Sequence, residues 1–198
     1  MVALRRLLFL ICLLGIQIST CAVANEVPNS ARRHSFQLIF LRQTWDELRL
    51  GYKADVAFAK LRSADWSKPL FVLGVDDIEL YLWASQTIIL KTAATDRLES
   101  DRTLSHGVFG VFVSGKPIYY GVVLDTLSQM GIDWPVLHQE KVNGHAVMHI
   151  LPVQIPLGER HPSGAAMEEM TPAAKSKRER IRDPRVEEVM AKAKILVK

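Results

Sequence analysis

The sequence predicts an α+β domain: a small antiparallel sheet with at least one β-hairpin, a long N-terminal helix packed on it, and a C-terminal tail that ends in a short helix. Three observations predict this class. Short runs of β-branched and aromatic residues recur between positions 70 and 150, as they do in a sheet. Two of these runs flank a glycine-containing turn at 114–116, which indicates a hairpin. Before them, Trp45, Leu48 and Tyr52 recur at helical spacing.

Residues 1–24 have the pattern of a secretory signal peptide. Arg5-Arg6 precedes an apolar run (7–18), and Ala22-Val23-Ala24 supplies the small residues of a cleavage site. The apolar run is shorter than the roughly twenty residues that a membrane helix needs. We therefore expect an exported protein, periplasmic or secreted, that is cleaved directly after this triplet.

Two alternatives stay open for the same segment. Thr20-Cys21 loosely resembles the lipobox of bacterial lipoproteins, in which a lipidated cysteine becomes the N-terminus. The segment could also stay uncleaved as an anchor.

Cys12 and Cys21 are the only cysteines, so cleavage after Ala24 leaves a chain without thiols. Such a chain has no disulfides, cysteine metal sites or thiol nucleophiles.

Charge is unevenly distributed along the chain. The formal net charge is +4, and the excess of Lys and Arg lies in residues 1–24 and 156–198, whereas the segment between them is nearly balanced. Binding to nucleic acid requires a clustered basic surface on the fold itself. We therefore expect no nucleic-acid partner.

The chain after the signal segment divides into three parts. A flexible leader (25–34) precedes a single α+β domain (35–155), and a basic tail broken by proline and glycine (156–198) follows it. The end of the tail predicts a short amphipathic helix, because Asp183 is a good N-cap and Pro184 suits the first helical position. We expect the tail to be an appendage that is able to make weak contact with a membrane surface.

The beginning of the domain predicts its long helix. The apolar run 35–41 suits either a buried strand or the first turns of a helix. We predict a helix over Gln43–Leu61 with Thr44 as its N-cap. Asp46 and Glu47 then lie in its first turn, where the helix dipole favours negative charge.

The rest of the domain predicts strands and one short helix. Three short strands are expected at 70–75, 78–82 and 87–90, followed by a helix at 92–102. The clearest pattern is the hairpin, with strands at 107–113 and 117–123 around the turn Ser114-Gly115-Lys116. A second hairpin is expected around Asn143-Gly144, a favoured turn dipeptide, with strands at 134–138 and 146–150.

Aromatic residues lie on or beside these strands and are the candidate ligand-binding residues. Aromatic side chains are enriched at binding surfaces because they combine apolar area with a polar group. They are also ordinary core residues, so most of them are expected to pack inside, with one exposed aromatic patch as the alternative. The candidates are Tyr81, Trp83, Tyr119, Tyr120 and Trp134.

Three histidines form the candidate metal site: His138, His145 and His149. The spacing of His145 and His149 places both imidazoles on one face only in a helix. In a strand they would lie about 13 Å apart, at roughly 3.3 Å per residue. Because the local sequence favours a strand, hydrogen-bonded surface histidines are the preferred interpretation and metal binding is the alternative.

These observations favour an exported, non-enzymatic binding or protein-interaction module of the cell envelope, without a cofactor. Its partner would be an unknown protein or a small ligand. Two alternatives remain open: an exported enzyme or metal-binding protein with a site around the histidines, and an envelope assembly factor that docks through its basic tail. No residue is predicted to be catalytic, because the sequence contains neither a G-x-S-x-G serine setting nor a phosphate-binding loop.

Overall fold

The computed structural model describes residues 35–100, 104, 106–124, 131–153 and 181–198. The predicted signal peptide, both cysteines, the predicted leader and most of the tail lie outside these residues. What the sequence predicts for those segments therefore stays a prediction.

Nine strands in the described residues form one mixed sheet, in the order β2-β1-β5-β6-β7-β8-β4-β3-β9. Neighbouring strands are antiparallel except for the parallel pairs β6–β7 and β3–β9. The predicted small antiparallel sheet is therefore wrong, because the sheet is large and mixed. The strands are β1 (Phe36–Thr44), β2 (Pro69–Gly74), β3 (Ile78–Leu82), β4 (Thr87–Leu90), β5 (Gly107–Val113), β6 (Lys116–Val123), β7 (Val136–Val142), β8 (His145–Leu151) and β9 (Leu196–Val197).

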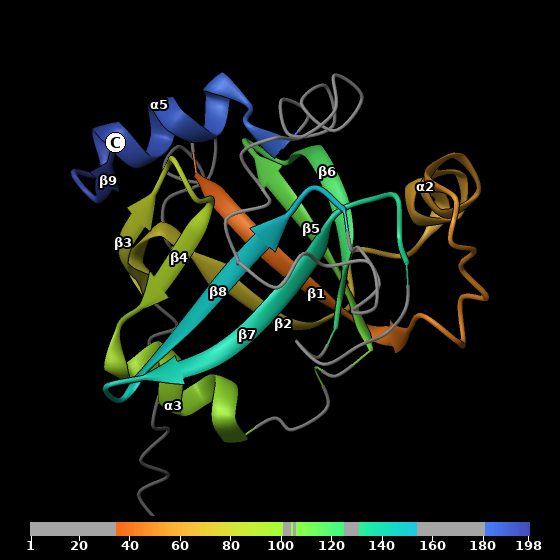
Figure 1. Ribbon diagram of the computed structural model, residues 1–198, viewed down its shortest axis with the longest axis horizontal. Helices are drawn as coiled ribbons and strands as arrows, with labels where there is room; N and C mark the ends of the chain where they lie inside the picture. The colour runs from red at the N-terminus through yellow and green to blue at the C-terminus, as the bar shows by residue number, and fades with distance from the viewer. Residues whose placement is uncertain (1–34, 101–103, 105, 125–130, 154–180) are drawn as a thin grey trace, which may run out of the picture.

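The described helices lie around this sheet. They are α2 (Ala54–Ser63), α3 (Thr92–Ser100), α5 (Pro184–Lys192) and the short 3-10 helix η2 (Val75–Asp77). Figure 1 shows α5 and α3 at opposite ends of the sheet, and α2 outside β5 and β6. Across the described part of the chain, no helix has both the length and the apolar character that a membrane span requires.

The sheet curls around one hydrophobic cluster. In Figure 1, β7 and β8 cross in front, and β1 and β2 lie behind. The inner cluster takes side chains from every strand from β1 to β8 and from α5. Although β1 and β9 are far apart in the strand order, α5 contacts both. A second cluster lies on the outer face of β1, β5 and β6, under α2.

Burial on both faces explains the apolar run that begins β1. Phe36, Leu38 and Phe40 belong to the inner cluster, whereas Ile39 and Leu41 belong to the outer one. A strand covered on both faces loses the alternation that marks a half-buried strand. For this reason the pattern alone did not distinguish a strand from a helix.

The predicted long helix over Gln43–Leu61 is wrong. β1 continues to Thr44, a turn follows, and α2 begins only at Ala54. The capping pattern does form, but it caps a single turn. The Thr44 N–H donates to the Glu47 carboxylate (2.8 Å), and the Glu47 N–H donates to Thr44 Oγ1 (3.4 Å). Arg49, at φ 48°, then takes the chain out of helical geometry.

Both predicted hairpins are confirmed. β5 pairs with β6 across Ser114-Gly115, and β7 pairs with β8 across Asn143-Gly144. All four turn residues have positive φ, with Gly115 at 72° and Gly144 at 85°. Two consecutive positive φ values are the requirement of the type I′ turn, which matches the twist of the flanking strands.

The end of the tail is part of the fold, so the expected appendage is wrong for residues 181–198. The predicted helix is present as α5, and the Asp183 side chain accepts a hydrogen bond from the Arg185 N–H (2.9 Å). However, Ile181, Val186 and Met190 are buried in the inner cluster. After α5, β9 adds to the edge of the sheet beside β3.

Candidate functional site

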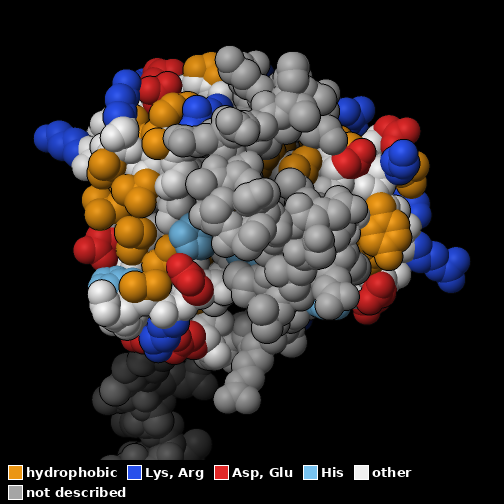
Figure 2. Space-filling view, viewed as in Figure 1, with side chains coloured by type: hydrophobic (Ala, Val, Ile, Leu, Met, Phe, Trp, Pro, Cys, Tyr) orange, Lys and Arg blue, Asp and Glu red, His pale blue; other side chains and the backbone are white. Residues whose placement is uncertain are grey.

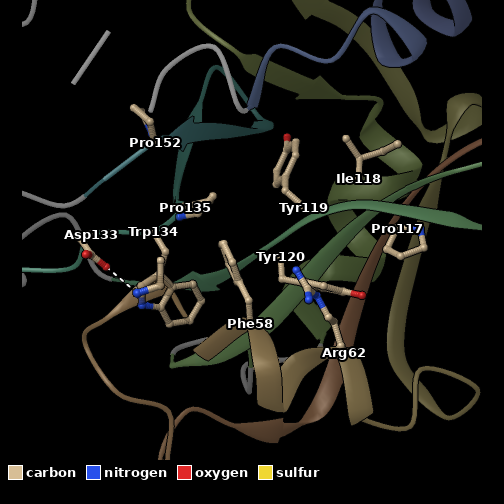
Figure 3. A pocket seen from close by; sticks show the side chains of 11 residues that line it. Phe58, Arg62, Pro117, Ile118, Tyr119, Tyr120, Asp133, Trp134, Pro135 and Pro152 are labelled. Carbon is tan, nitrogen blue, oxygen red and sulfur yellow. Dashed lines mark hydrogen bonds between the residues drawn. The ribbon is translucent and has the colours of Figure 1, made fainter. Parts of the chain in front are cut away.

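A pocket of about 460 Å³ lies between α2 and the junction of β6 and β7. Figure 3 shows its lining side chains, which come from α2, from the first half of β6 and from the segments just before β7 and just after β8. Its volume falls within the range of small-ligand sites. The lining residues are Ala54, Phe58, Arg62, Pro117, Ile118, Tyr119, Tyr120, Asp133, Trp134, Pro135 and Pro152.

The pocket exists because two neighbouring strands separate. β6 pairs with β7 only at Val122 and Val123. The Val122 N–H donates to the Pro135 carbonyl (3.1 Å), and the Leu124 N–H donates to the Leu137 carbonyl (3.0 Å). The next donor toward the start of β6 would be the nitrogen of residue 135, and a proline nitrogen carries no hydrogen. Pro135 therefore ends the ladder, and the first half of β6 borders the pocket.

A hydrogen bond to a distant residue fixes α2 beside the pocket. No side chain caps α2 locally at Lys53. Instead, the Ala54 N–H donates to Asp133 Oδ1 (2.7 Å), which satisfies one free donor of the first helical turn. The neighbouring Trp134 is held in the same way, because its indole N–H donates to the Gly51 carbonyl (3.3 Å). These contacts join both walls of the pocket.

Aromatic rings form the rigid floor of the pocket. Phe58 lies between Tyr120 and Trp134 in Figure 3, with ring centroids at 6.3 Å and 6.1 Å. Behind them, Trp66 stacks on Tyr120 at 5.2 Å, and Trp45 stacks on Trp134 at 5.5 Å. Rings that are already packed lose little conformational entropy when a ligand binds.

Trp66 reaches this position because Gly110 has no side chain. A Cβ on Gly110 would lie 3.0 Å from the Trp66 ring. A glycine inside a strand often marks such a close approach of another group.

The pocket combines one neutral phenol with one cation. Burial raises the pKa of Tyr120, and the positive charge of Arg62 partly opposes this shift. Burial also raises the pKa of Tyr119. Both phenols therefore stay protonated at neutral pH. The Tyr119 ring belongs to the inner cluster, so the phenol donor on the pocket side is the Tyr120 hydroxyl. Arg62 is exposed at the rim, beside Tyr120 in Figure 3.

The structure brings three of the five candidate aromatics together. Tyr119, Tyr120 and Trp134 all line the pocket. Tyr81 and Trp83 lie elsewhere: Tyr81 is fully buried and its hydroxyl donates to Gln86 Oε1 (2.8 Å), and the Trp83 ring packs beside it at 6.2 Å.

Sequence reasoning missed the residues that α2 contributes to the pocket. Phe58 and Arg62 share one face of that helix through their i, i+4 spacing. The pair was missed because the predicted helix ended at Leu61, one residue before Arg62, and because the contact of this helix with β6 joins distant segments.

The three histidines are spread along the β7–β8 hairpin. His138 and His149 are direct cross-strand partners. His145 lies at the other end of β8, where its Nδ1 is 2.9 Å from the Leu90 carbonyl and 3.2 Å from the Glu79 carboxylate. Within the described ranges, no three side chains of His, Cys, Asp or Glu gather as a metal site would require.

His149 belongs to a chain of polar side chains that sequence reasoning did not find. Its Nε2 lies 2.9 Å from Glu140 Oε1, and its Nδ1 lies 3.0 Å from Thr87 Oγ1. Thr87 Oγ1 is in turn 2.8 Å from the hydroxyl of Ser85, which is exposed in the turn between β3 and β4. Gln86, between the two hydroxyl residues, has a positive φ of 54°.

A third surface feature is apolar. Hydrophobic side chains gather over β3 and β4 at the left of Figure 2. Leu80 and Val197 contribute to this edge of the sheet and are 38% and 43% exposed. Single exposed apolar residues are common on protein surfaces, so this edge is a weaker candidate than the pocket.

Comparisons with known proteins do not assign a family. No family model matches the chain, and neither the curated proteins nor the solved structures include a significant match. Function must therefore be argued from the site itself.

Proposed function

We propose that this protein is an exported, non-enzymatic binding module of the cell envelope that holds its ligand in the pocket between α2 and β6. The observation that supports this proposal is an open pocket of about 460 Å³ whose lining includes packed aromatic rings, with one cation at the rim. An apolar cavity with a few converging polar groups is the usual form of a ligand site.

The lining defines the chemical class of the ligand. The rings of Phe58 and Trp134 favour an apolar or aromatic body. Arg62 at the rim favours an anionic group at one end of the ligand, because guanidinium pairs well with carboxylate, sulfonate or phosphate. The Tyr120 hydroxyl, next to Arg62, adds a neutral donor.

Titration with anilinonaphthalene sulfonate, an aromatic anionic dye, tests this function. We expect saturable binding to the folded protein, and about tenfold weaker binding to Phe58→Ala. Phe71→Ala is the matched control, because Phe71 is also partly buried but packs against Phe40 at 6.3 Å, away from the pocket. A cooperative urea unfolding transition is the check that each variant is folded. Equal affinity of the wild type and Phe58→Ala would contradict the proposal.

Export is supported by the sequence of residues 1–24 alone. The basic start, the short apolar run and the small residues before Asn25 together fit a cleaved signal. With cleavage there, the module would act without cysteines in an oxidising compartment.

A second candidate function is supported by the polar chain at His149. In that candidate, Ser85 attacks an ester carbonyl. Its proton passes to Thr87, and the Thr87 proton passes to His149 Nδ1, while Glu140 holds the Nε2 hydrogen. The new Ser85 Oγ–C bond replaces the bond to the leaving alcohol, which takes the proton back from His149 through Thr87. Water, losing a proton by the same route, then hydrolyses the acyl-serine and regenerates the Ser85 hydroxyl. An exported esterase would use this geometry.

A fluorophosphonate probe tests this second candidate. An esterase predicts labelling of the wild type that is lost in Ser85→Ala and in His149→Gln. Ser114→Ala, which changes another exposed turn serine, should keep the label. Absence of labelling in the wild type would exclude the candidate.

The third possibility, an assembly factor that docks through its tail helix, has less support. The apolar face of α5 is occupied by the core, since Val186 is 1% and Met190 0% exposed. That face is therefore not available to a membrane or a partner while the domain is folded.

A further inference from the structure

We infer that the ligand of this pocket is an extended polypeptide segment, which adds to the open side of β6 as a further strand and inserts one apolar side chain among the aromatic rings. The inference rests on the proposed function and specifies its ligand class. It draws on the backbone of β6, on the shape of the lining and on the charge at the rim.

The first argument is the open strand edge. Residues 116, 117 and 119–121 of β6 pair with β5 on one side, but no strand of the described residues pairs with them on the other. Edges of this kind offer backbone donors and acceptors to an incoming strand. Proteins that bind peptides by strand addition use such edges.

The second argument is the direction of the backbone groups. The Val122 N–H points away from β5, since it donates to the Pro135 carbonyl. Peptide groups alternate along a strand, so the Tyr120 N–H and C=O point to the same side. That side is where the pocket lies and where Pro135 cannot donate. An incoming strand would supply the donor that residue 135 lacks.

The third argument is the shape of the pocket. Four consecutive β6 residues, 117–120, line it. The pocket therefore extends along the strand, as a site for an extended peptide would. In the pairing with β5, Ile118 is the extra residue of a β-bulge, between Pro117 opposite Phe112 and Tyr119 opposite Val111. Bulges re-aim side chains at sheet edges and beside sites.

The fourth argument is charge. Arg62 is the cation among the lining residues, whereas Asp133 already accepts the Ala54 N–H. A peptide with a carboxylate beside its apolar side chain would therefore pair with Arg62. The partner that fits is an extended segment with one aromatic or large aliphatic residue next to an acidic residue or a C-terminal carboxylate.

A pair of labelled peptides tests the inference. The first alternates valine and threonine around one phenylalanine followed by aspartate. The second has the same side chains, but its alternate backbone amides are N-methylated. Fluorescence anisotropy with the full chain should show saturable binding of the first peptide and about tenfold weaker binding of the second, because methylation removes the ladder donors.

Charge reversal gives a matched pair of protein variants. Arg62→Glu should weaken binding of the aspartate peptide by about tenfold and strengthen binding of a lysine analogue. Lys91→Glu makes the same change of charge at an exposed residue outside the pocket. It should bind both peptides as the wild type does.

The possible outcomes separate the inference from the proposed function. If the dye binds in a Phe58-dependent manner but both peptides bind equally or not at all, the pocket takes small ligands and strand addition is excluded. If the protein instead forms a dimer that Arg62→Glu dissociates, a second copy occupies the edge and the inference is overturned. If neither the dye nor any peptide binds, the proposed function fails as well.

Discussion

At the residue scale, the opening beside β6 depends on Gly121 and Pro135. A Cβ on Gly121 would lie 2.2 Å from the Phe109 ring and 2.7 Å from the Pro135 carbonyl oxygen. Because Gly121 has no side chain, the backbone of β6 lies close to Pro135, and β6 pairs with β7 from Val122 onward. The residues of β6 before Gly121 diverge from β7. Only glycine fits at this point.

We therefore expect Gly121→Ala to lower the free energy of unfolding by about 1–3 kcal/mol, the usual cost of overpacking. Gly74→Ala is the matched control, since its Cβ would meet only Asp77 Oδ2 at 3.9 Å. It should change stability by less than about 0.5 kcal/mol. Urea unfolding midpoints measure both effects, and equal midpoints for the two variants would show that the close contact is absent.

Single residues also show which local features a sequence encodes. Ser114-Gly115 and Asn143-Gly144 specify their turns through their own φ preferences, so both hairpins could be predicted. Asp133 could not be assigned a role, because it caps α2 from 79 residues away.

At the element scale, α5 combines a locally encoded start with a tertiary role. The Arg185 guanidinium donates two hydrogen bonds to Asp183, at 2.7 Å and 2.8 Å, and the pKa of Asp183 is lowered by these bonds and by the Arg185 N–H. A carboxylate with a lowered folded-state pKa stabilises the fold above its unfolded pKa of about 3.9, and this stabilisation is lost as the pH falls through the folded value.

Asp183→Ala should therefore cost about 0.5–2 kcal/mol at neutral pH, the range for loss of an N-cap. The difference from the wild type should shrink as the pH falls below about 4, because the wild-type carboxylate then becomes protonated. Urea unfolding over a pH series measures this. A difference that stays constant to low pH would mean that the charge of Asp183 contributes nothing.

The core role of α5 has its own test. Met190 is fully buried in the inner cluster, so Met190→Ala should cost about 2–5 kcal/mol. Val189→Ala, on the partly exposed side of the same helix, should cost less. If both substitutions left the unfolding midpoint unchanged, α5 would be the appendage that the proline-rich and basic composition of the tail indicated.

At the scale of the whole molecule, local patterns identified most strands but not their assembly. The runs that became β2, β3 and β4 were predicted close to their observed bounds. The curl, the parallel pairing of β6 with β7 and the addition of β9 to β3 depend on contacts between distant segments. For the same reason, the sequence could identify Tyr119, Tyr120 and Trp134 as candidate ligand-binding residues. It could not show that Phe58 and Arg62 line the same pocket.

Export also concerns the whole molecule. N-terminal sequencing of the protein recovered from an expressing bacterium should give a chain that starts at Asn25, as the signal pattern predicts. A chain that starts with lipidated Cys21 would replace this account with a lipid anchor. A chain that retains residue 1 would indicate an uncleaved segment.

The central claim is that the open side of β6 binds an extended polypeptide. Amide hydrogen exchange measured by NMR, with and without the phenylalanine–aspartate peptide, tests it most directly. The Tyr120 amide, which points into the opening, should exchange at least about tenfold more slowly with bound peptide. The Tyr119 amide points toward β5 and should change little. Unchanged exchange at Tyr120, with new protection at another surface, would contradict the claim.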